Sequence, residues 1–428
     1  MIAQTLYAGK DGGISDERLR QALEDSLADC RGRLKKVLLI PPDFTRLHSM
    51  AGRVCTICDE LLRDACRVDI LPALGTHAPL SREQAAEMLP GIAFERLLVH
   101  NWRTDTVKLG EVPAAFVREV SEGLLDTAIP VEVNRRLVEG GYDLILSAGQ
   151  VVPHEVVGMA NYSKNIFVGV GGREMINASH ILGAFYGLER IMGRERTPVR
   201  RVFDYAQEHF LNDIPLEYAL TVTTTQGEQT SLEGLFLGEG RRSFEKAAAL
   251  SQEKNICFVE RPIQKAVAWL DPAEFHTTWI GNKAIYRTRM ALADGGELLI
   301  LAPGVRAFGE DAGIDALIRK YGFRGREETI RLYKANRDLQ ENQGAAAHLI
   351  HSSTDGRFRV TYCTKALSEA EVRGAGFGWM DYGEAAAKYL PADRRDGFHT
   401  LPDGEEIYFI GNPALGLWAE RERFESMR

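Results

Sequence analysis

The chain has 428 residues, which is long for one hydrophobic core and typical of two domains. Its hydrophobic fraction of 45%, charged fraction of 26% and net charge of −8 are those of an ordinary globular protein, and they exclude a global attraction to nucleic acid or to an anionic membrane. An anionic substrate must therefore be bound by a local basic site. The amino terminus lacks the basic and apolar segments of a signal peptide, and the apolar runs are too short to span a membrane, so we expect a cytoplasmic protein.

Six cysteines are scattered along the chain, and only Cys55 and Cys58 form a CxxC pair. No second pair or nearby histidine set completes a tetrahedral zinc site. The pair lies in a predicted helix, where burial is favoured over a redox role. The cysteine pattern therefore agrees with a reducing compartment.

In the first half of the chain, short apolar runs alternate with segments of helical spacing. Lys36 to Ile40 is predicted as a buried strand that ends at Pro41-Pro42, and Ser81-Arg82-Glu83-Gln84 has the form of a helix start. Such alternation favours a largely parallel sheet whose faces are covered by helices. The other strands predicted here are 68–74, 94–99, 128–133 and 144–147, and a helix is predicted at 53–65.

In sheets of this kind, functional groups gather beyond the carboxyl ends of the strands. Four side chains follow a predicted strand end: Asp43, Arg46, His77 and His154. We therefore expect them to lie close together. His100 also follows a predicted strand, and a buried histidine with satisfied hydrogen bonds is favoured there over one that lines the cleft.

The second half begins a new α/β unit after a less periodic region, 192–245, which contains one expected strand at 218–225. We place the domain boundary at residue 255, which gives a cofactor-binding catalytic domain (1–255) and a substrate-binding domain (256–428), with the last strand and helix as candidates to pack back on the first. The predicted fold is α/β, with two domains, mainly parallel sheets and an active-site cleft between them. The second domain is expected to contain strands at 256–259, 297–301, 359–363 and 406–410, and helices at 281–292, 311–321 and 327–338.

The densest group of chemically reactive residues lies between 147 and 180. His154 follows a strand end, Lys164 comes ten residues later, and His180 comes sixteen residues after the lysine. The glycine cluster Val168-Gly169-Val170-Gly171-Gly172-Arg173 lies in between, and glycines let the backbone approach a ligand and present amides to an anion. From the residues alone, a lysine beside such a loop indicates either a phosphate contact or an amine nucleophile.

The order and spacing of these residues resemble the lactate racemase family, whose members use a nickel-pincer nucleotide. In that family a histidine after a proline is catalytic, a lysine ten residues on bonds to the cofactor, and a histidine sixteen residues further on ligates nickel. Pro153-His154, Lys164 and His180 match this pattern. The family also has an Asp-x-Thr-Arg turn and a later Gly-x-His, which match Asp43-Phe44-Thr45-Arg46 and Gly75-Thr76-His77.

The resemblance implies a racemase or epimerase that inverts C2 of a 2-hydroxy acid. Hydride leaves C2 while a base takes the hydroxyl proton, which gives a planar 2-oxo acid that can be reduced on its other face. The resemblance assigns the two acid–base roles to His77 and His154, since imidazoles titrate near neutral pH. It assigns the nickel to His180, and it assigns the covalent tether of the cofactor, nickel pyridinium-3,5-bisthiocarboxylic acid mononucleotide, to Lys164.

Further contacts are expected around these residues. Arg46 is counted as catalytic and substrate-binding, because a guanidinium can donate two parallel hydrogen bonds to a carboxylate or steady a developing charge. An ordinary turn in which Asp43 caps the next helix is the alternative reading of this segment, and a surface position is the alternative for Arg173. The expected cofactor contacts are Asp43, Thr45, Gly171, Gly172 and Arg173.

The sequence departs from the family pattern in two places, and the resemblance weakens in the second domain. The Ser-Gly-Gly that precedes the tether lysine in lactate racemases is Ala160-Asn161-Tyr162-Ser163 here. The Tyr-Gln-x-x-Lys that holds the lactate carboxylate is Tyr286-Arg287-Thr288-Arg289-Met290. On a helix Lys283, Arg287 and Met290 share a face. We therefore expect Tyr286, with Arg287 or Lys283, to bind an acid larger or more polar than lactate, such as a sugar acid or a hydroxy diacid.

Two other functions remain open on the sequence alone. A nicotinamide-dependent 2-hydroxy acid dehydrogenase suits two α/β halves, but no G-x-G-x-x-G opens a helix in an early βαβ unit. A non-catalytic cofactor-binding homologue would keep Lys164 and His180 but has no need for two bases. The expected partners are a small 2-hydroxy acid and cofactor-synthesis proteins, with no nucleic acid and no membrane. The particular acid and the oligomeric state, a homodimer included, are left open.

Overall fold

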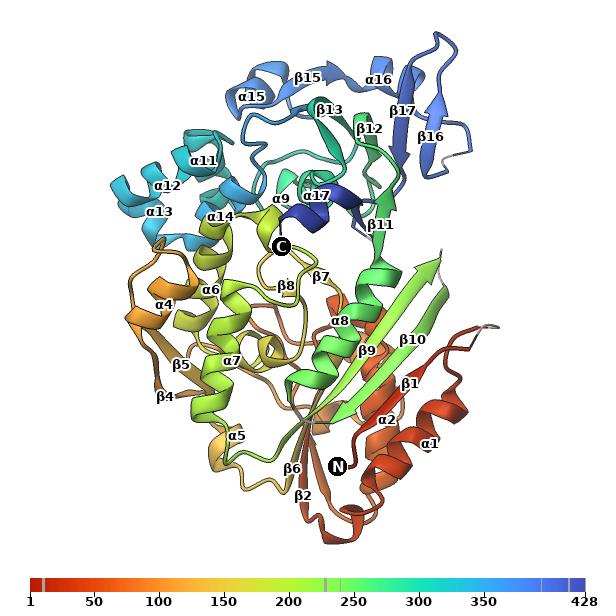
Figure 1. Cartoon of the computed structure of the whole chain (residues 1–428), viewed down its shortest axis with the longest axis vertical. Helices are drawn as coiled ribbons and strands as arrows, with labels where there is room; N and C mark the ends of the chain where they lie inside the picture. Colours follow the sequence, from red (N-terminus) through yellow and green to blue (C-terminus); the bar gives the residue numbers. More distant parts are fainter. Residues whose placement is uncertain (10–11, 227–228, 239, 394, 415, 428) are drawn as a thin grey trace. The chain divides into compact units, whose positions relative to one another are not determined.

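The structure, a computed structural model, describes residues 1–9, 12–226, 229–238, 240–393, 395–414 and 416–427 (Figure 1). Its internal contacts divide the chain into two α/β units. The first unit comprises Met1–Leu182 and Met192–Asn255, and the second comprises Gly183–Ile191 and Ile256–Arg428. Helix α6 (Arg173–Tyr186) therefore begins in the first unit and ends in the second.

The first unit is built on a six-stranded sheet in the order β1-β10-β9-β6-β2-β3. β2 is parallel to both β3 and β6, and β6 is parallel to β9, whereas β10 and β1 run antiparallel to their neighbours. Because β2, β3 and β6 are parallel, the segments that follow them emerge at the same edge of the sheet. The strands are β1 (Gln4–Tyr7), β2 (Lys36–Ile40), β3 (Arg67–Ile70), β6 (Leu144–Gln150), β9 (Leu216–Gln226) and β10 (Gln229–Gly238).

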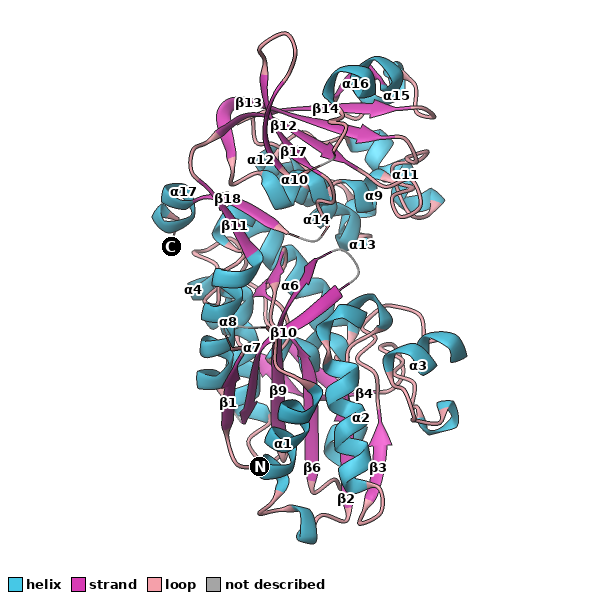
Figure 2. Ribbon diagram, turned by 90° about the vertical axis from the view of Figure 1, so that its right-hand side faces the viewer, coloured by secondary structure: helices cyan, strands magenta, loops and turns pink. Residues whose placement is uncertain are grey.

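Helices cover both faces of this sheet (Figure 2), with α1 and α2 on one face and α7 and α8 on the other. The residues of β2 alternate between the two cores: Val37 and Leu39 lie under α1 and α2, and Leu38 lies under α7 and α8. This is the continuous apolar run expected of a strand that is buried on both faces. The helices are α1 (Asp16–Leu27), α2 (Ala51–Leu62), α7 (Pro198–Phe210) and α8 (Arg241–Asn255).

The CxxC pair lies in α2 and is fully buried in the core. Burial raises the pKa of the Cys55 thiol and raises that of Cys58 to about 12. A thiol that is held neutral in this way is a poor nucleophile and a poor metal ligand. The two cysteines therefore fill space in the core, as their position in the sequence predicts.

Shorter elements complete the first unit. The helix start predicted at Ser81 is confirmed: its Oγ accepts from the N–H of Gln84, and the Gln84 side chain accepts from the N–H of Ser81. β4 and β5 form an antiparallel pair of their own, and β7 and β8 form a short hairpin. These elements are α3 (Arg82–Met88), β4 (Thr106–Val112), α4 (Ala114–Val120), β5 (Ile129–Asn134), α5 (Arg136–Glu139), β7 (Pro153–His154) and β8 (Gly158–Met159).

The strand predicted at 94–99 is wrong. Phe94–Arg96 form a single 3-10 turn, because the guanidinium of Arg96 turns inward. It donates hydrogen bonds of 2.6 and 3.0 Å to the buried carboxylate of Asp59 on α2, and one of 3.0 Å to the carbonyl of Val68. This charged pair therefore anchors the start of the segment, and Leu97 keeps one isolated parallel bridge, to Ile70.

Asp59→Ala is expected to lower the free energy of unfolding by about 3 kcal/mol, because it leaves the partly buried Arg96 without its carboxylate. The matched control is Glu60→Ala, the next residue on α2, whose ion pair with Arg20 is more exposed. The control is expected to cost less than about 1 kcal/mol. Urea unfolding measures both losses, and equal losses would contradict the anchoring role of Asp59.

The second unit is built on a six-stranded sheet in the order β15-β14-β13-β12-β17-β16. Every neighbouring pair in it is parallel except β16 and β17, so the predicted class of α/β units with mainly parallel sheets is confirmed. β11 and β18, the first and last strands of the unit, pair separately in parallel. The strands are β11 (Ile256–Val259), β12 (Ile263–Trp269), β13 (Leu292–Ala302), β14 (Arg359–Thr364), β15 (Gly378–Asp381), β16 (Gly397–Thr400), β17 (Glu406–Ile410) and β18 (Leu417–Glu420).

The helix predicted at 281–292 is shorter in the structure. It consists of two short helices, the second of which ends at Thr288, and Met290 instead forms a parallel bridge with Ala419 of β18. Met290 therefore does not share a helical face with Lys283 and Arg287. The helices of this unit are α9 (Thr278–Gly281), α10 (Lys283–Thr288), α11 (Ala312–Tyr321), α12 (Arg326–Ala335), α13 (Arg337–Glu341), α14 (Gln343–His351), α15 (Glu369–Gly374), α16 (Tyr382–Tyr389) and α17 (Arg421–Ser426).

His348 of α14 is buried in the second unit. Its ring stacks on that of Trp279 with 4.2 Å between centroids, and its Nε2 lies 3.5 Å from the amide nitrogen of Asn282. Burial lowers the pKa of His348 to about 3, with a smaller effect of the same sign from His351. The folded protein therefore holds this imidazole neutral well below pH 6.

The stability of the protein is expected to decrease in mild acid because of His348. The unfolded chain binds a proton on this imidazole below about pH 6.5, whereas the folded chain does so only near pH 3. His348 alone is expected to lower the free energy of unfolding by roughly 2 kcal/mol between pH 7 and pH 5. Urea unfolding followed by tryptophan fluorescence at the two pH values measures this loss. An identical pH dependence in wild type and in His348→Gln would contradict the prediction.

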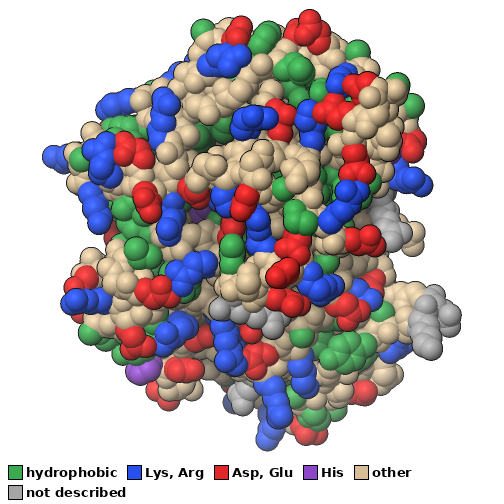
Figure 3. Space-filling view, turned by 45° about the horizontal axis from the view of Figure 1, so that its top comes forward, with side chains coloured by type: hydrophobic (Ala, Val, Ile, Leu, Met, Phe, Trp, Pro, Cys, Tyr) green, Lys and Arg blue, Asp and Glu red, His purple; other side chains and the backbone are tan. Residues whose placement is uncertain are grey.

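The surface carries mixed charge. Figure 3 shows lysine and arginine side chains interspersed with aspartate and glutamate over the face that it draws. Among the residues that the structure describes, no helix has the length and apolar character needed to cross a membrane.

Candidate active site

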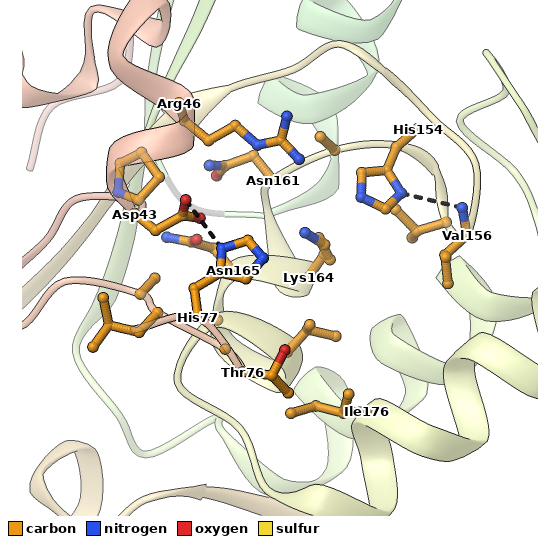
Figure 4. Close-up of a pocket in the computed structure, with 18 of the residues that line it drawn as sticks. Asp43, Arg46, Thr76, His77, His154, Val156, Asn161, Lys164, Asn165 and Ile176 are labelled. Carbon is orange, nitrogen blue, oxygen red and sulfur yellow. Dashed lines mark hydrogen bonds and ion pairs between the residues drawn. The ribbon is translucent and has the colours of Figure 1, made fainter. Parts of the chain in front are cut away.

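A cavity of about 210 Å³ opens in the first unit, at the edge where β2, β3 and β6 end. Its walls come from the turn after β2, the loop after β3, the β7–β8 hairpin with the loop that follows it, and α6. The structure thus brings together residues that lie far apart in the sequence (Figure 4). Those predicted from the sequence are Asp43, Arg46, His77, His154, Lys164 and His180.

Asp43 caps its turn and also lines the cavity, and its contact with a cofactor stays a prediction. Its Oδ1 accepts hydrogen bonds of 2.9 and 2.5 Å from the N–H and Oγ1–H of Thr45, and it lies 3.2 Å from Nδ1 of His77 (Figure 4). Burial alone would raise the pKa of Asp43, but the hydrogen bonds from His77 and Thr45, with the charge of Arg46, hold it well below its usual value. Asp43 is therefore an anion at neutral pH, and Thr45 orients it.

The contact with Asp43 fixes the tautomer of His77. A carboxylate can only accept, so Nδ1 of His77 carries the hydrogen and the neutral ring has its lone pair on Nε2. An imidazole with a carboxylate behind it and a free lone pair in front is the arrangement of a general base.

His154 has the opposite arrangement. It is buried, and its Nδ1 accepts a hydrogen bond of 3.1 Å from the backbone N–H of Val156 (Figure 4). Burial lowers the pKa of His154 well below its usual value, so the ring is neutral and its hydrogen lies on Nε2. In this geometry His154 presents a hydrogen-bond donor where His77 presents an acceptor.

His180 has the form of a metal ligand. Its Nδ1 donates a hydrogen bond of 2.6 Å to the carbonyl of Ile176, one turn earlier on α6, which leaves the lone pair on Nε2. Burial lowers the pKa of His180, which keeps the ring neutral. The described residues contain no group of three His, Cys, Asp or Glu side chains suited to a metal, so an ion bound by His180 would need other ligands.

Lys164 is an amine whose charge is disfavoured by its surroundings. Burial, followed by repulsion from Arg46, lowers the pKa of Lys164 to about 8. Roughly a tenth of such an amine is neutral and nucleophilic at pH 7. Lys164 immediately precedes the single π-helical turn Asn165–Gly169, a form that often occurs at functional sites.

The loop before Lys164 has an unusual backbone. Asn161 and Tyr162 have φ values of 61° and 56°, in the left-handed region that glycine adopts freely. For residues with side chains this conformation costs about 1 kcal/mol each. Gly149 makes room for the loop, since a Cβ there would lie 1.5 Å from Nδ2 of Asn161. The loop therefore has the left-handed conformation at two residues that are not glycine.

The cavity also contains polar residues that the sequence analysis missed. Nδ2 of Asn165 donates a hydrogen bond of 2.9 Å to Oγ of Ser147, and Nε2 of Gln150 donates one of 2.7 Å to Oγ1 of Thr223. The signal that could have found them was position: one ends β6, two adjoin a residue already selected, and one lies three residues before Lys164. The missed residues are Gln150, Glu155, Asn161 and Asn165.

The glycine pair is explained by packing in the described structure. The carbonyl of Gly171 lies 3.1 Å from Nε2 of His100, and a Cβ on Gly172 would lie 2.1 Å from the carboxylate of Glu132. His100 is buried and satisfied, as favoured from the sequence. Arg173 is exposed at the start of α6. None of Gly171, Gly172 and Arg173 lines the cavity, so their cofactor contacts stay a prediction.

The residues expected to bind substrate lie in the second unit. Tyr286 is buried, and Nη1 of Arg287 donates a hydrogen bond of 3.2 Å to the carbonyl of Gly416. Lys283 begins α10, one turn before Arg287. Their contact with a substrate stays a prediction.

Comparisons with known proteins agree with this fold. Residues 14–189 match the family model described as the lactate racemase N-terminal domain. The structure is similar to the crystal structure of a Thermotoga maritima protein, with a TM-score of 0.78 and 24% identity over 96% of this chain and 100% of that one. It is also similar to the lactate racemase apoprotein from Thermoanaerobacterium thermosaccharolyticum, with a TM-score of 0.71 and 18% identity over 96% of this chain and 94% of that one. No curated protein matches the chain.

Proposed function

Because residues 14–189 belong to the lactate racemase N-terminal domain family, we propose that this chain is an isomerase that inverts C2 of a 2-hydroxy acid with a nickel-pincer nucleotide. The proposal rests mainly on the cavity of the first unit. This cavity contains a lysine whose amine is partly deprotonated at neutral pH, a histidine whose Nε2 lone pair is available to a metal, and two further histidines. The residues are Lys164, His180, His77 and His154.

The chemistry of these residues fits the cofactor. Lys164 offers an amine that could hold the cofactor through a thioamide: the new C–N bond would form as a C–O bond of the thiocarboxylic acid breaks, with loss of water. His180 offers one neutral imidazole nitrogen, which suffices if the pincer supplies the other nickel ligands. When bound, the cofactor would supply a pyridinium ring that accepts a hydride from C2 and returns it.

The side chains of the cavity perform the proton chemistry. His77 takes the hydroxyl proton of the substrate at Nε2, and Asp43 stabilises the imidazolium that forms. Arg46 steadies the substrate carboxylate or the charge that develops on the oxygen. His154 donates a hydrogen bond to that oxygen from Nε2. To act as a second base, His154 must instead accept a proton at Nε2, and it then loses the hydrogen bond that its Nδ1 accepts from Val156.

We propose a substrate larger or more polar than lactate, such as a sugar acid or a hydroxy diacid. Support comes from the amide side chains of Gln150, Asn161 and Asn165 in the cavity and from the arginine at position 287. We further propose that Tyr286, with Arg287 or Lys283, holds the carboxylate, and that the protein works in the cytoplasm with cofactor-synthesis proteins.

The proposal is tested with protein produced alongside the cofactor-making enzymes. Intact mass, nickel content and chiral analysis of a panel of 2-hydroxy acids are measured on the same sample. The expected result is a covalent mass increase, about one nickel per chain, as one imidazole ligand allows, and inversion of at least one acid in the panel. A chain with neither adduct nor nickel would contradict the proposal. Reduction of free NAD by a 2-hydroxy acid would instead support the nicotinamide-dependent dehydrogenase.

A further inference from the structure

Arg200 is a buried cation that none of the roles above uses. It lies on α7 with no exposed surface, and its pKa is lowered by burial to about 10, so it stays charged at neutral pH. Its Nε has no hydrogen-bond partner among the described residues. A buried charge of this kind is costly unless hydrogen bonds and nearby opposite charge compensate for it.

Among the described residues, the side-chain hydrogen bonds of Arg200 go to the loop before Lys164. Nη1 donates to Oγ of Ser163 at 2.7 Å, and Nη2 donates to the carbonyls of Met159 and Asn161 at 2.7 and 3.1 Å. None of these acceptors is a carboxylate. The guanidinium also lies over the ring of Phe244, 4.4 Å from its centroid, which fixes its plane. The hydrogen bonds of the guanidinium therefore hold residues 159–163, while the nearby carboxylate of Asp204 partly offsets its charge.

The loop is also the strained part of the cavity wall. Asn161 and Tyr162 have left-handed backbone conformations that persist only where surrounding contacts impose them. Arg200 provides such contacts on both sides of the pair, at Met159 and at Ser163. A rigid fork with several donors in fixed directions can hold both sides at once, which the single ammonium of a lysine cannot.

A second arginine in the same cluster lacks this contact. Arg241 of α8 forms an ion pair with Asp204 of α7 and donates to the carbonyl of Glu195 at 2.7 Å. Within the described part of the chain its side chain makes no hydrogen bond to residues 159–163, although Asp204 itself lies 3.4 Å from Oγ of Ser163. Arg241 is therefore a matched control for the loss of a guanidinium at this place in the fold.

We propose that Arg200 is a positioning residue that holds residues 159–163, with Asn161 and Tyr162 in the left-handed conformation, and so presents the amine of Lys164 to the cavity for tether formation. This inference rests on the proposed function, because it takes Lys164 as the point of cofactor attachment.

The holding role is tested on the full chain without cofactor. Hydrogen–deuterium exchange of the peptide that covers residues 158–168 is compared in wild type, Arg200→Lys and Arg241→Lys. Exchange in this peptide is expected to rise roughly tenfold or more in Arg200→Lys, which loses charge-assisted hydrogen bonds to the loop, and to stay near wild type in Arg241→Lys. Unchanged exchange in Arg200→Lys would overturn the inference.

The positioning role is tested on the chain produced with the cofactor. The readout is the ratio of covalent adduct to bound nickel, which a general loss of folded protein leaves unchanged. Arg200→Lys and Ser163→Ala are expected to lower this ratio, and adding Asn161→Gly to Arg200→Lys is expected to restore it, because glycine adopts the left-handed conformation without help.

The outcomes separate this inference from the proposed function. A wild-type ratio in Arg200→Lys, or an equal fall in Arg241→Lys, would overturn the positioning role. A ratio that Asn161→Gly does not restore would show that Arg200 acts by another route, and it would overturn the conformational account. A wild-type chain with no adduct would overturn the proposed function and the tether with it, while the exchange result still decides whether Arg200 holds the loop.

Discussion

Lys164→Ala is expected to abolish the covalent mass increase, to remove most of the nickel, and to lower the rate of C2 inversion by roughly 1,000-fold or more. The reason is that Lys164 is the amine of the cavity whose pKa is lowered to about 8, and its removal leaves His180 as a single imidazole ligand that cannot retain the cofactor. Intact mass, metal analysis and chiral chromatography measure the three losses on one preparation.

The matched control for this variant is Lys108→Ala. Lys108 is an exposed lysine of β4 that pairs with Glu111, so it keeps an ammonium on the surface and away from the cavity. It is expected to keep the adduct, the nickel and the full rate. Retention of the adduct in Lys164→Ala would contradict the tether and move the attachment point elsewhere.

His77→Gln is expected to lower kcat by roughly 100-fold or more, because it removes the Nε2 lone pair that takes the substrate proton. His154→Gln is expected to have a much smaller effect, because the glutamine amide keeps an N–H donor in place of Nε2–H. The difference follows from the hydrogen bonds at Nδ1: His77 donates to Asp43, and His154 accepts from Val156.

Both variants are measured with each enantiomer of the best substrate, after adduct formation has been verified by mass. Asp43→Asn serves as a further check, since it keeps the size of the side chain and removes the charge behind His77. Equal losses of 100-fold or more in His77→Gln and His154→Gln would support two equivalent bases, and they would contradict the asymmetric assignment.

The position of the cavity could be predicted from the sequence because parallel strands impose it. Asp43, His77 and His154 each follow an apolar run by a few residues, and parallel β2, β3 and β6 bring such segments to one edge. Lys164 and His180 could be selected only by spacing, since neither follows a strand. Their place in the same cavity depends on the π-helical turn and on α6, which no local signal predicts.

Tertiary contacts decided what the sequence could not show. The segment 94–99 contains the apolar residues of a strand, but Arg96 turns inward to the buried carboxylate of Asp59, so Phe94–Arg96 form a 3-10 turn and Leu97 forms an isolated bridge with Ile70. Met290 leaves its predicted helix because it forms a bridge with Ala419, far along the chain. The role of Arg200 could not be predicted from the sequence. Its acceptors are mainly backbone carbonyls, and no glycine at Asn161 or Tyr162 indicates the left-handed conformation of the loop.

The most direct test of the central claim follows the hydrogen at C2. A 2-hydroxy acid that the protein inverts is labelled with deuterium at C2 and incubated in ordinary water with the cofactor-loaded chain, and the product is analysed by chiral separation and mass. The account predicts an inverted product that keeps its deuterium, because a hydride is removed and returned without exchange with solvent. Inversion with loss of deuterium to water would show proton abstraction at C2, and it would contradict hydride transfer in this cavity.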